Sequence, residues 1–295
     1  MKIIFSRKGF DASGKCGRIP SPILPDGTLL SLPIPEWENR SLVKYRDLKS
    51  VNGHSPAKVI FDLTGGRDVK PTTKTHFDPD LRRCMLPRRS GWRPIFGPHP
   101  SCHTHMTKQQ VKIGDLILFF GWFRKVHLVN GTYCFTPNEP DLHVLFGWLQ
   151  IGEMHPAGPQ NRRTAPEWAR DHPHFLNDSR ANNYVYISSD QLSIPRLKKK
   201  IPGGGVFEKY LPDLRLTAPE PNRLRSVWQL PRTIYPERGK ELLSYHSIHS
   251  KKNPWTHATA HTLLRTRAKG QEFVLHADEC PEAISWARGL ITRNG

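Results

Sequence analysis

The sequence has no long apolar run. The apolar start at residues 3–5 is interrupted by Arg7 and Lys8, and no later run approaches the roughly 20 residues that a membrane-spanning helix needs. Neither a secretory signal pattern nor a lipidation motif is present. We therefore expect no membrane partner and predict a cytoplasmic protein.

Cysteine is also scarce. The five cysteines are an odd number, are widely spaced and include no C-x-x-C pair, which argues against a disulfide framework and a zinc ribbon. The segment GPHPSCHTHM at 97–106 brings three histidines close to Cys102, but no second pair of ligands is evident. The sequence thus predicts no metal site. His105, just before a predicted turn and strand, is a better candidate for acid–base chemistry.

Acidic residues are few beside basic ones. The 26 Asp and Glu residues face 44 Lys and Arg residues, which gives a formal net charge of +18. A charge of this sign attracts polyanions and does not specify a fold. With membranes set aside, the expected partner is a nucleic acid, and DNA is the favoured one.

Proline and glycine are abundant and evenly spread. The 27 prolines and 22 glycines divide the chain into short elements, which favours a sheet-rich body over a helical bundle. Apolar runs predict strands at 2–6, 58–63, 115–120, 143–151, 184–188 and 272–275. A C-terminal helix is predicted at 281–291 and a second helix at 256–267. No long linker splits the chain, so we predict a single α+β domain over 1–295, with a mixed or barrel-like central sheet and a C-terminal helix.

The N-terminal strand runs directly into a charged, glycine-rich loop. The strand predicted at 2–6 ends at Ser6, Arg7 and Lys8 follow directly, and Asp11 comes next in the loop. Arg7 would grip a phosphate in a bidentate fork, with Lys8 as a point charge and Asp11 as a base or an orienting group. Neither the P-loop nor the dinucleotide fingerprint is present. The alternative is a charged loop that contributes only non-specific attraction.

Two central apolar segments each contain Gly-Trp. These are GDLILFFGWFRKV at 114–126 and HVLFGWLQIGE at 143–153, which loosely resemble strands of small base-recognising barrels of the PUA and EVE type. Trp122 and Trp148 are therefore candidates for stacking on a base, a contact worth about 1–3 kcal/mol. Tyr186, in the strand predicted at 184–188, is a third candidate. The alternative is a hairpin of core strands in which the glycines mark bulges.

Two carboxylate segments complete the set of candidates. In THFDPDL at 75–81, His76, Asp78 and Asp80 would share one face of an extended chain and suit acid–base or metal chemistry, but a turn is the favoured interpretation. Glu272 begins a strand after a Gly-Gln turn, and in this it resembles the catalytic glutamate of ADP-ribosyltransferases. Arg7 and Ser188 would supply the other two positions of that pattern. An ordinary strand-end carboxylate is the alternative.

The phrases KIIFSRKGFD at 2–11, GDLILFFGWFR at 114–124 and GQEFVL at 270–275 together resemble one family. This is the third of the nucleotide modification associated domains of bacteria and phages, and the resemblance extends from Met1 to about Ile291. It implies a place in DNA base hypermodification systems. It further implies a site lined by Ser6, Arg7, Lys8, Asp11, His105, Gln271 and Glu272.

The resulting hypothesis is an enzyme that modifies a base of DNA or of a nucleotide, by transferase chemistry. An exposed or flipped base would be the target, because the reacting atoms are inaccessible inside a duplex. The cofactor is unknown, with NAD or another nucleotide as a candidate co-substrate for ADP-ribosyl or glycosyl transfer. Catalysis is assigned to Arg7, Asp11, His105 and Glu272, and phosphate or nucleic-acid binding to Ser6, Arg7, Lys8 and Gln271. The alternative function is a non-catalytic reader that binds a modified base in a PUA- or EVE-like pocket.

Overall fold

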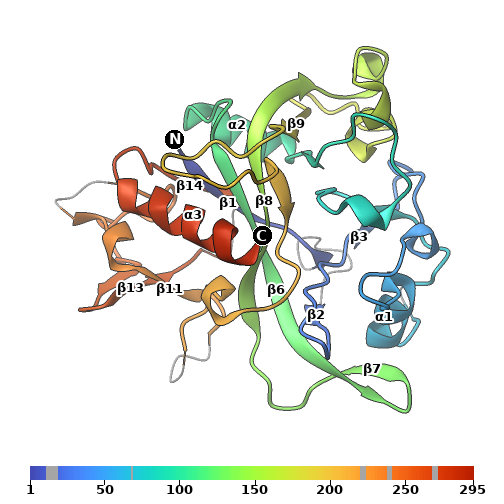
Figure 1. Ribbon diagram of the computed structural model, residues 1–295, viewed down its shortest axis with the longest axis horizontal. Helices are drawn as coiled ribbons and strands as arrows, with labels where there is room; N and C mark the ends of the chain where they lie inside the picture. The colour runs from blue at the N-terminus through green and yellow to red at the C-terminus, as the bar shows by residue number, and fades with distance from the viewer. Residues whose placement is uncertain (11–18, 68, 220–223, 238–240, 268–271) are drawn as a thin grey trace.

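The computed structural model describes residues 1–10, 19–67, 69–219, 224–237, 241–267 and 272–295. A large mixed sheet dominates it, with strands in the order β14-β1-β6-β8-β9-β5 (Figure 1). These strands are β14 (Glu272–Leu275), β1 (Ile3–Arg7), β6 (Leu116–Val129), β8 (Leu142–Pro156), β9 (Tyr184–Ser188) and β5 (Ile95–Phe96). Three more strands join its flanks: β2 (Ser21–Ile23) and β7 (Thr132–Phe135) pair with β6, and β10 (Gly204–Val206) pairs with β8.

The long strands β6 and β8 form the centre of this sheet. They pair antiparallel, with a break in register between Phe119 and Phe120 that marks a β-bulge. Residues 116–121 of β6 and 142–151 of β8 are buried, as expected where both faces of a sheet are covered. β1 lies parallel to β6 and antiparallel to β14, which places the N-terminal strand between two segments distant in sequence.

A smaller sheet has the order β11-β13-β12, from β11 (Val227–Pro231), β13 (His261–Arg265) and β12 (Trp255–His257). It lies on the α3 side of the molecule, at the left of Figure 1. The helix predicted at 256–267 is therefore wrong. Thr262 and Leu264 are buried while Leu263 and Arg265 are less so, a period-two pattern that suits a strand.

The strand predicted at 58–63 is also wrong, because this segment lies in α1 (Pro56–Thr64). Ser55 caps the helix by accepting a hydrogen bond from the Lys58 amide, and Pro56 takes the first-turn position. Gly65 ends it with a left-handed φ of 62°. A short apolar run fits either element, and here the caps determine the helix.

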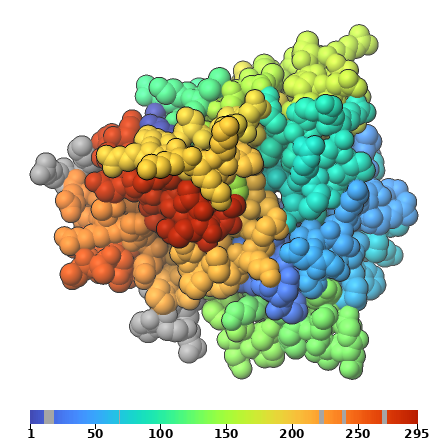
Figure 2. Space-filling view, viewed as in Figure 1, coloured from blue at the N-terminus to red at the C-terminus, as the bar shows by residue number. Residues whose placement is uncertain are grey.

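The other helices are α2 (Pro100–Lys108) and α3 (Pro281–Asn294), and a two-stranded sheet joins β3 (Ile34–Pro35) to β4 (Thr75–His76). α3 confirms the predicted C-terminal helix and packs on the core with Ala283, Ala287, Leu290 and Ile291. The segment at 189–203 lies across α3 (Figure 2), where Arg288 Nη1 donates to the carbonyl of Pro195 at 2.6 Å.

The predicted fold class is thus confirmed: an α+β, sheet-rich structure with a mixed central sheet and a C-terminal helix. The described strands form an open sheet, from β14 at one end to β5 at the other, and not a closed barrel. The other five predicted strands are all present. In the part of the chain that the structure describes, every helix is too short or too polar to cross a membrane.

Candidate functional site

Glu272 meets two residues of the N-terminal strand. β14 pairs with β1 so that Glu272 lies opposite Ser6. Ser6 Oγ donates to Glu272 Oε1 at 3.2 Å, and Lys8 Nζ donates to the same oxygen at 2.8 Å. Ser6 and Lys8 reach one carboxylate because residues two apart in an extended chain share a face. The structure therefore brings together three of the residues predicted for the site.

This ion pair is buried. The side chains of Lys8 and Glu272 are 8% and 0% exposed. Burial opposes the charge on Lys8, but the Glu272 carboxylate outweighs it and raises the pKa of Lys8. The second carboxylate oxygen, Oε2, is also buried and finds no hydrogen-bond partner among the described residues. Since an unsatisfied buried charged group is costly, Oε2 is a position where a ligand would be stabilised.

The helix α2 lies beside this pair and contributes Cys102 and His105. Burial, the charge of Glu272 and the close approach of the thiol to the Glu272 carboxylate raise the pKa of Cys102 to about 12, so this cysteine remains a thiol and is a weak nucleophile. The Nε2 atom of His105 is bonded to Ser244 Oγ at 3.1 Å, and its ring stacks on Tyr245 with centroids 4.2 Å apart. Burial lowers the pKa of His105. His105 is thus a neutral neighbour whose Nε2 is already bonded.

Lys8 lines a polar cavity of about 220 Å³. Its other lining residues are Gly9, Ile34, Arg40, His76, Asp78, Gly97, His99, His174 and Arg180. The guanidinium of Arg180 is held by Asp178 at 2.6 and 2.7 Å, and that of Arg40 lies 3.3 Å from Glu36. The cavity therefore combines oriented cations with imidazoles and one carboxylate, a set suited to a polar or anionic ligand.

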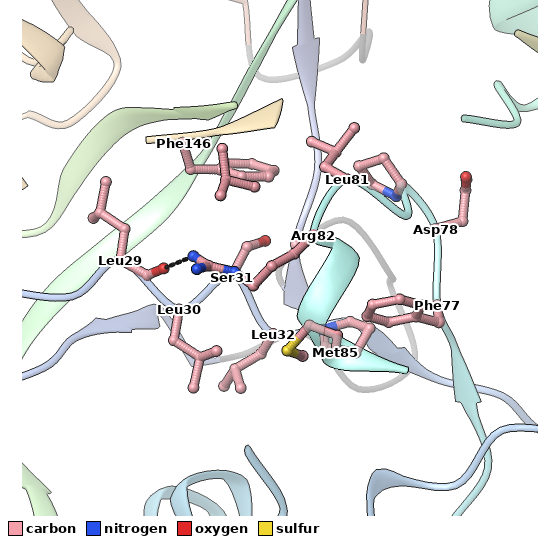
Figure 3. A pocket seen from close by; sticks show the side chains of 14 residues that line it. Leu29, Leu30, Ser31, Leu32, Phe77, Asp78, Leu81, Arg82, Met85 and Phe146 are labelled. Carbon is pink, nitrogen blue, oxygen red and sulfur yellow. Dashed lines mark hydrogen bonds between the residues drawn. The ribbon is translucent and has the colours of Figure 1, made fainter. Parts of the chain in front are cut away.

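A smaller apolar pocket of about 50 Å³ borders the cavity and shares Gly9 and Asp78 with it. Leucine side chains, Phe77, Met85 and Phe146 surround this pocket (Figure 3). Arg82 closes one side by donating to the Leu29 carbonyl at 3.3 Å. In Figure 3 the carboxylate of Asp78 points away from these apolar side chains. Asp78 thus stands at the boundary between an apolar and a polar chamber.

Asp78 is surrounded by histidines from a distant segment. His172 and His174 flank the start of a 3-10 helix, η6 (Pro173–Phe175). His172 Nε2 lies 3.2 Å from Asp78 Oδ1, and His174 Nε2 lies 3.8 Å from Oδ2. Burial opposes ionisation of Asp78, but His172, His174 and His76 together lower the pKa of Asp78 to about 2. Burial lowers the pKa of His174.

His172, His174 and Arg180 were not predicted from the sequence. The usable signal was a pair of spaced motifs, H-x-D at 76–78 and H-x-H at 172–174. The expected common face of His76, Asp78 and Asp80 is formed only by the first two. Asp80 instead makes a bidentate pair with Arg88, at 2.6 and 2.7 Å.

Arg7 does not join Lys8 at the cavity. It lies between Ser6 and Lys8 in an extended segment, so its side chain leaves from the opposite face. There its charge, after burial, contributes to lowering the pKa of His143 to about 3. Ser188 is likewise displaced from Glu272, because it lies on β9, where it pairs with Ile151 of β8, and β8, β6 and β1 lie between β9 and β14. The three-residue arrangement of ADP-ribosyltransferases is therefore not assembled here.

The three aromatic candidates lie apart from the cavity. Trp148 is 3% exposed and packs on Phe207, and Tyr186 is fully buried with its hydroxyl 2.7 Å from His103 Nδ1. The Arg225 guanidinium lies over the ring of Trp122 at 4.0 Å. Trp148 and Tyr186 are thus packed in the core. Asp11 and Gln271 fall outside the described residues.

Comparison with known families places the chain among domains associated with nucleotide modification. The matching family model is described as nucleotide modification associated domain 3 and covers residues 2–276 of the 295. The chain belongs to this family, and the resemblance stated from the sequence is confirmed. No curated protein and no solved structure matches the chain.

Proposed function

We propose that the protein is an enzyme that modifies a base of DNA or of a nucleotide, with its active site in the cavity that Lys8 lines, next to the ion pair of Lys8 with Glu272. Family membership supports the association with nucleotide modification. The observation that carries the proposal is the state of the Glu272 carboxylate. Ser6 and Lys8 hold Oε1, while Oε2 is buried without a partner among the described residues.

Glu272 acts as a proton acceptor in this proposal. The Lys8 cation pairs with Oε1 of the carboxylate, and Oε2 accepts a hydrogen bond from an amino or hydroxyl group of the substrate. Exocyclic amino groups of bases are natural donors to a carboxylate. As the nitrogen or oxygen attacks a donor molecule, its proton passes to Oε2 and the leaving group departs from the donor. A well-placed general base contributes about 10²–10⁴-fold to such a step.

The cations of the cavity would hold phosphate. Arg40 pairs with Glu36 and Glu38, and Arg180 pairs with Asp178. The N–H groups of each guanidinium that these pairs do not use would bind the nucleotide. A base in duplex DNA would be extruded to reach this depth. The donor molecule would be a nucleotide-type co-substrate, of which NAD is one candidate. Because Trp148 and Tyr186 are buried in the core, the structure favours this enzyme over a reader that stacks a base on them.

The test compares the nucleosides of DNA and of the free nucleotide pool from cells that express the protein. The variants are Glu272→Gln, which keeps the shape of the side chain, and Glu282→Gln, an exposed glutamate on α3 that serves as control. Mass spectrometry should find a modified nucleoside with the native chain and the control. With Glu272→Gln it should fall by about 100-fold or more, while DNA affinity stays unchanged. Equal product from Glu272→Gln would refute the proposed role.

A further inference from the structure

We propose that His76, Asp78 and His174 form a binding site for one divalent transition-metal ion of the Zn²⁺ type. One ligand atom from each residue lies within 4.8 Å of the others. The residues come from β4, from the segment after it and from η6, so the fold itself brings them together. The inference is independent of Glu272, because it concerns metal binding alone.

Both histidines are oriented as metal ligands usually are. His76 Nδ1 lies 3.1 Å from Glu36 Oε2, and His174 Nδ1 lies 2.6 Å from Asn183 Oδ1. Asn183 Nδ2 already donates to the carbonyls of His174 and Asp178, so its Oδ1 is an acceptor. Each Nδ1 therefore carries the proton, and each Nε2 keeps a lone pair for a metal. Such outer partners fix ring orientation and tautomer at known metal sites.

The carboxylate and the surrounding backbone are also arranged for an ion. Asp78 Oδ1 accepts from the Gly97 amide at 2.8 Å and lies 3.2 Å from His172 Nε2, while Oδ2 faces His174. A Cβ atom at Gly97 would overlap the His174 ring. Glycine at this position thus lets the imidazole approach the backbone and reach Asp78. The Asp78 side chain is only 5% exposed, so the site is built into the fold.

Two imidazoles and one carboxylate suit Zn²⁺ and related first-row ions better than Mg²⁺ or Ca²⁺. A zinc–nitrogen bond of about 2.1 Å places neighbouring ligands of a tetrahedral ion about 3.4 Å apart. The His174–Asp78 separation of 3.8 Å is close to this value. Three protein ligands leave a fourth position, and all three residues line the cavity that Lys8 also lines. An open position of this kind is typical of catalytic ions, not of structural ones.

The experiment titrates the full chain with Zn²⁺ after removal of metal by a chelator, using a chromophoric competitor to measure affinity. One ion per chain should bind. Glu36→Gln removes only the outer partner of His76 and should reduce the Zn²⁺ affinity by about 10–100-fold. Asp78→Asn and His76→Gln each remove a ligand and should each reduce the affinity by more than that. Asp80 is a matched buried carboxylate that is bound to Arg88, and Asp80→Asn should bind Zn²⁺ as tightly as the native chain does. Glu272→Gln should also bind normally, which separates this inference from the proposed function.

A spectroscopic arm needs no variant. Co²⁺ added to the native chain should give the visible absorption of a four-coordinate ion with nitrogen ligands. The inference is overturned if the native chain binds no stoichiometric Zn²⁺ and gives no such absorption. It is equally overturned if folded Asp78→Asn and His76→Gln bind Zn²⁺ as tightly as the native chain, or if Asp80→Asn loses as much affinity as they do.

Discussion

Lys8 Nζ and Glu272 Oε1 lie 2.8 Å apart although 264 residues separate them in the chain. The contact follows from the pairing of β1 with β14, which sets Ser6 opposite Glu272 and turns Lys8 to the same face. Both side chains are buried, and Lys8 also lines the cavity. The ion pair thus links the stability of the central sheet to the proposed chemistry.

Removal of one partner should therefore be costly. Lys8→Met leaves the Glu272 carboxylate buried without its cation, and we expect a loss of about 3–5 kcal/mol in the free energy of unfolding. The double variant Lys8→Met/Glu272→Gln removes both charges and should recover most of this loss. Urea unfolding measures both values. A loss below about 1 kcal/mol for Lys8→Met would show that the pair is not buried in solution.

Stability should fall in mild acid because of His143. Its Nδ1 accepts from the Trp228 indole at 2.9 Å, and burial, with Arg7 and Arg225 nearby, lowers the pKa of His143 to about 3. Between pH 6.5 and about 3 the unfolded chain binds a proton there that the folded chain does not. The free energy of unfolding should thus decrease by about 1.4 kcal/mol per pH unit from this residue as pH falls.

The matched variant is His143→Gln, which keeps an acceptor for Trp228 but does not titrate. Unfolding of both proteins at several values between pH 7 and 4 gives two slopes. The slope of the free energy of unfolding against pH should be smaller for the variant by about 1 kcal/mol per pH unit. Parallel slopes would mean that His143 takes up its proton over the same pH range in the folded and the unfolded chain.

We predict that His105 positions its neighbours on β14 and takes no part in proton transfer. Its Nε2 bonds to Ser244 Oγ, which also accepts from the Val274 amide on β14. We expect His105→Ala to reduce product by less than about tenfold, far less than loss of a general base, and to leave the shape of the pH–activity profile unchanged. A loss as large as that of Glu272→Gln would instead assign His105 to proton transfer.

Nucleic-acid binding should depend strongly on salt. Each phosphate contact contributes about −0.9 to the slope of log affinity against log salt for duplex DNA. Lys198, Lys199 and Lys200 are exposed in the segment at 189–203. Changing all three to Gln should reduce the slope by up to about 2.7 if each contacts a phosphate. An unchanged slope would place the DNA on another face.

The sequence predicted the main sheet well because its strands are continuous apolar runs in β6, β8, β9 and β14. It failed at 58–63, where a capped helix and a strand share one apolar composition, and at 256–267, where short strands alternate in burial. Ser6, Lys8 and Glu272 were predictable from their place at strand ends. Side chains alternate between the two faces of β1, so the sequence already implies that Arg7 points away from the face that Ser6 and Lys8 share.

The cluster of His76, Asp78 and His174 was not predicted, for a different reason. His76 and Asp78 were considered, but their partner His174 lies in a segment without strand or long helix, and no local pattern connects 78 with 174. Only the tertiary fold brings η6 against β4. Long-range contacts between irregular segments leave little trace in a single sequence. The single domain over 1–295 stays a prediction.

The most direct measurement is a crystal structure of the protein with a nucleotide bound in the cavity beside Lys8. An amino or hydroxyl group of the ligand should lie 2.6–3.2 Å, about one hydrogen bond, from Glu272 Oε2, with the phosphate near Arg40 or Arg180. A nucleotide bound at another place, with Oε2 still lacking a partner and the cavity occupied only by water, would contradict the assignment of Glu272 as the catalytic base.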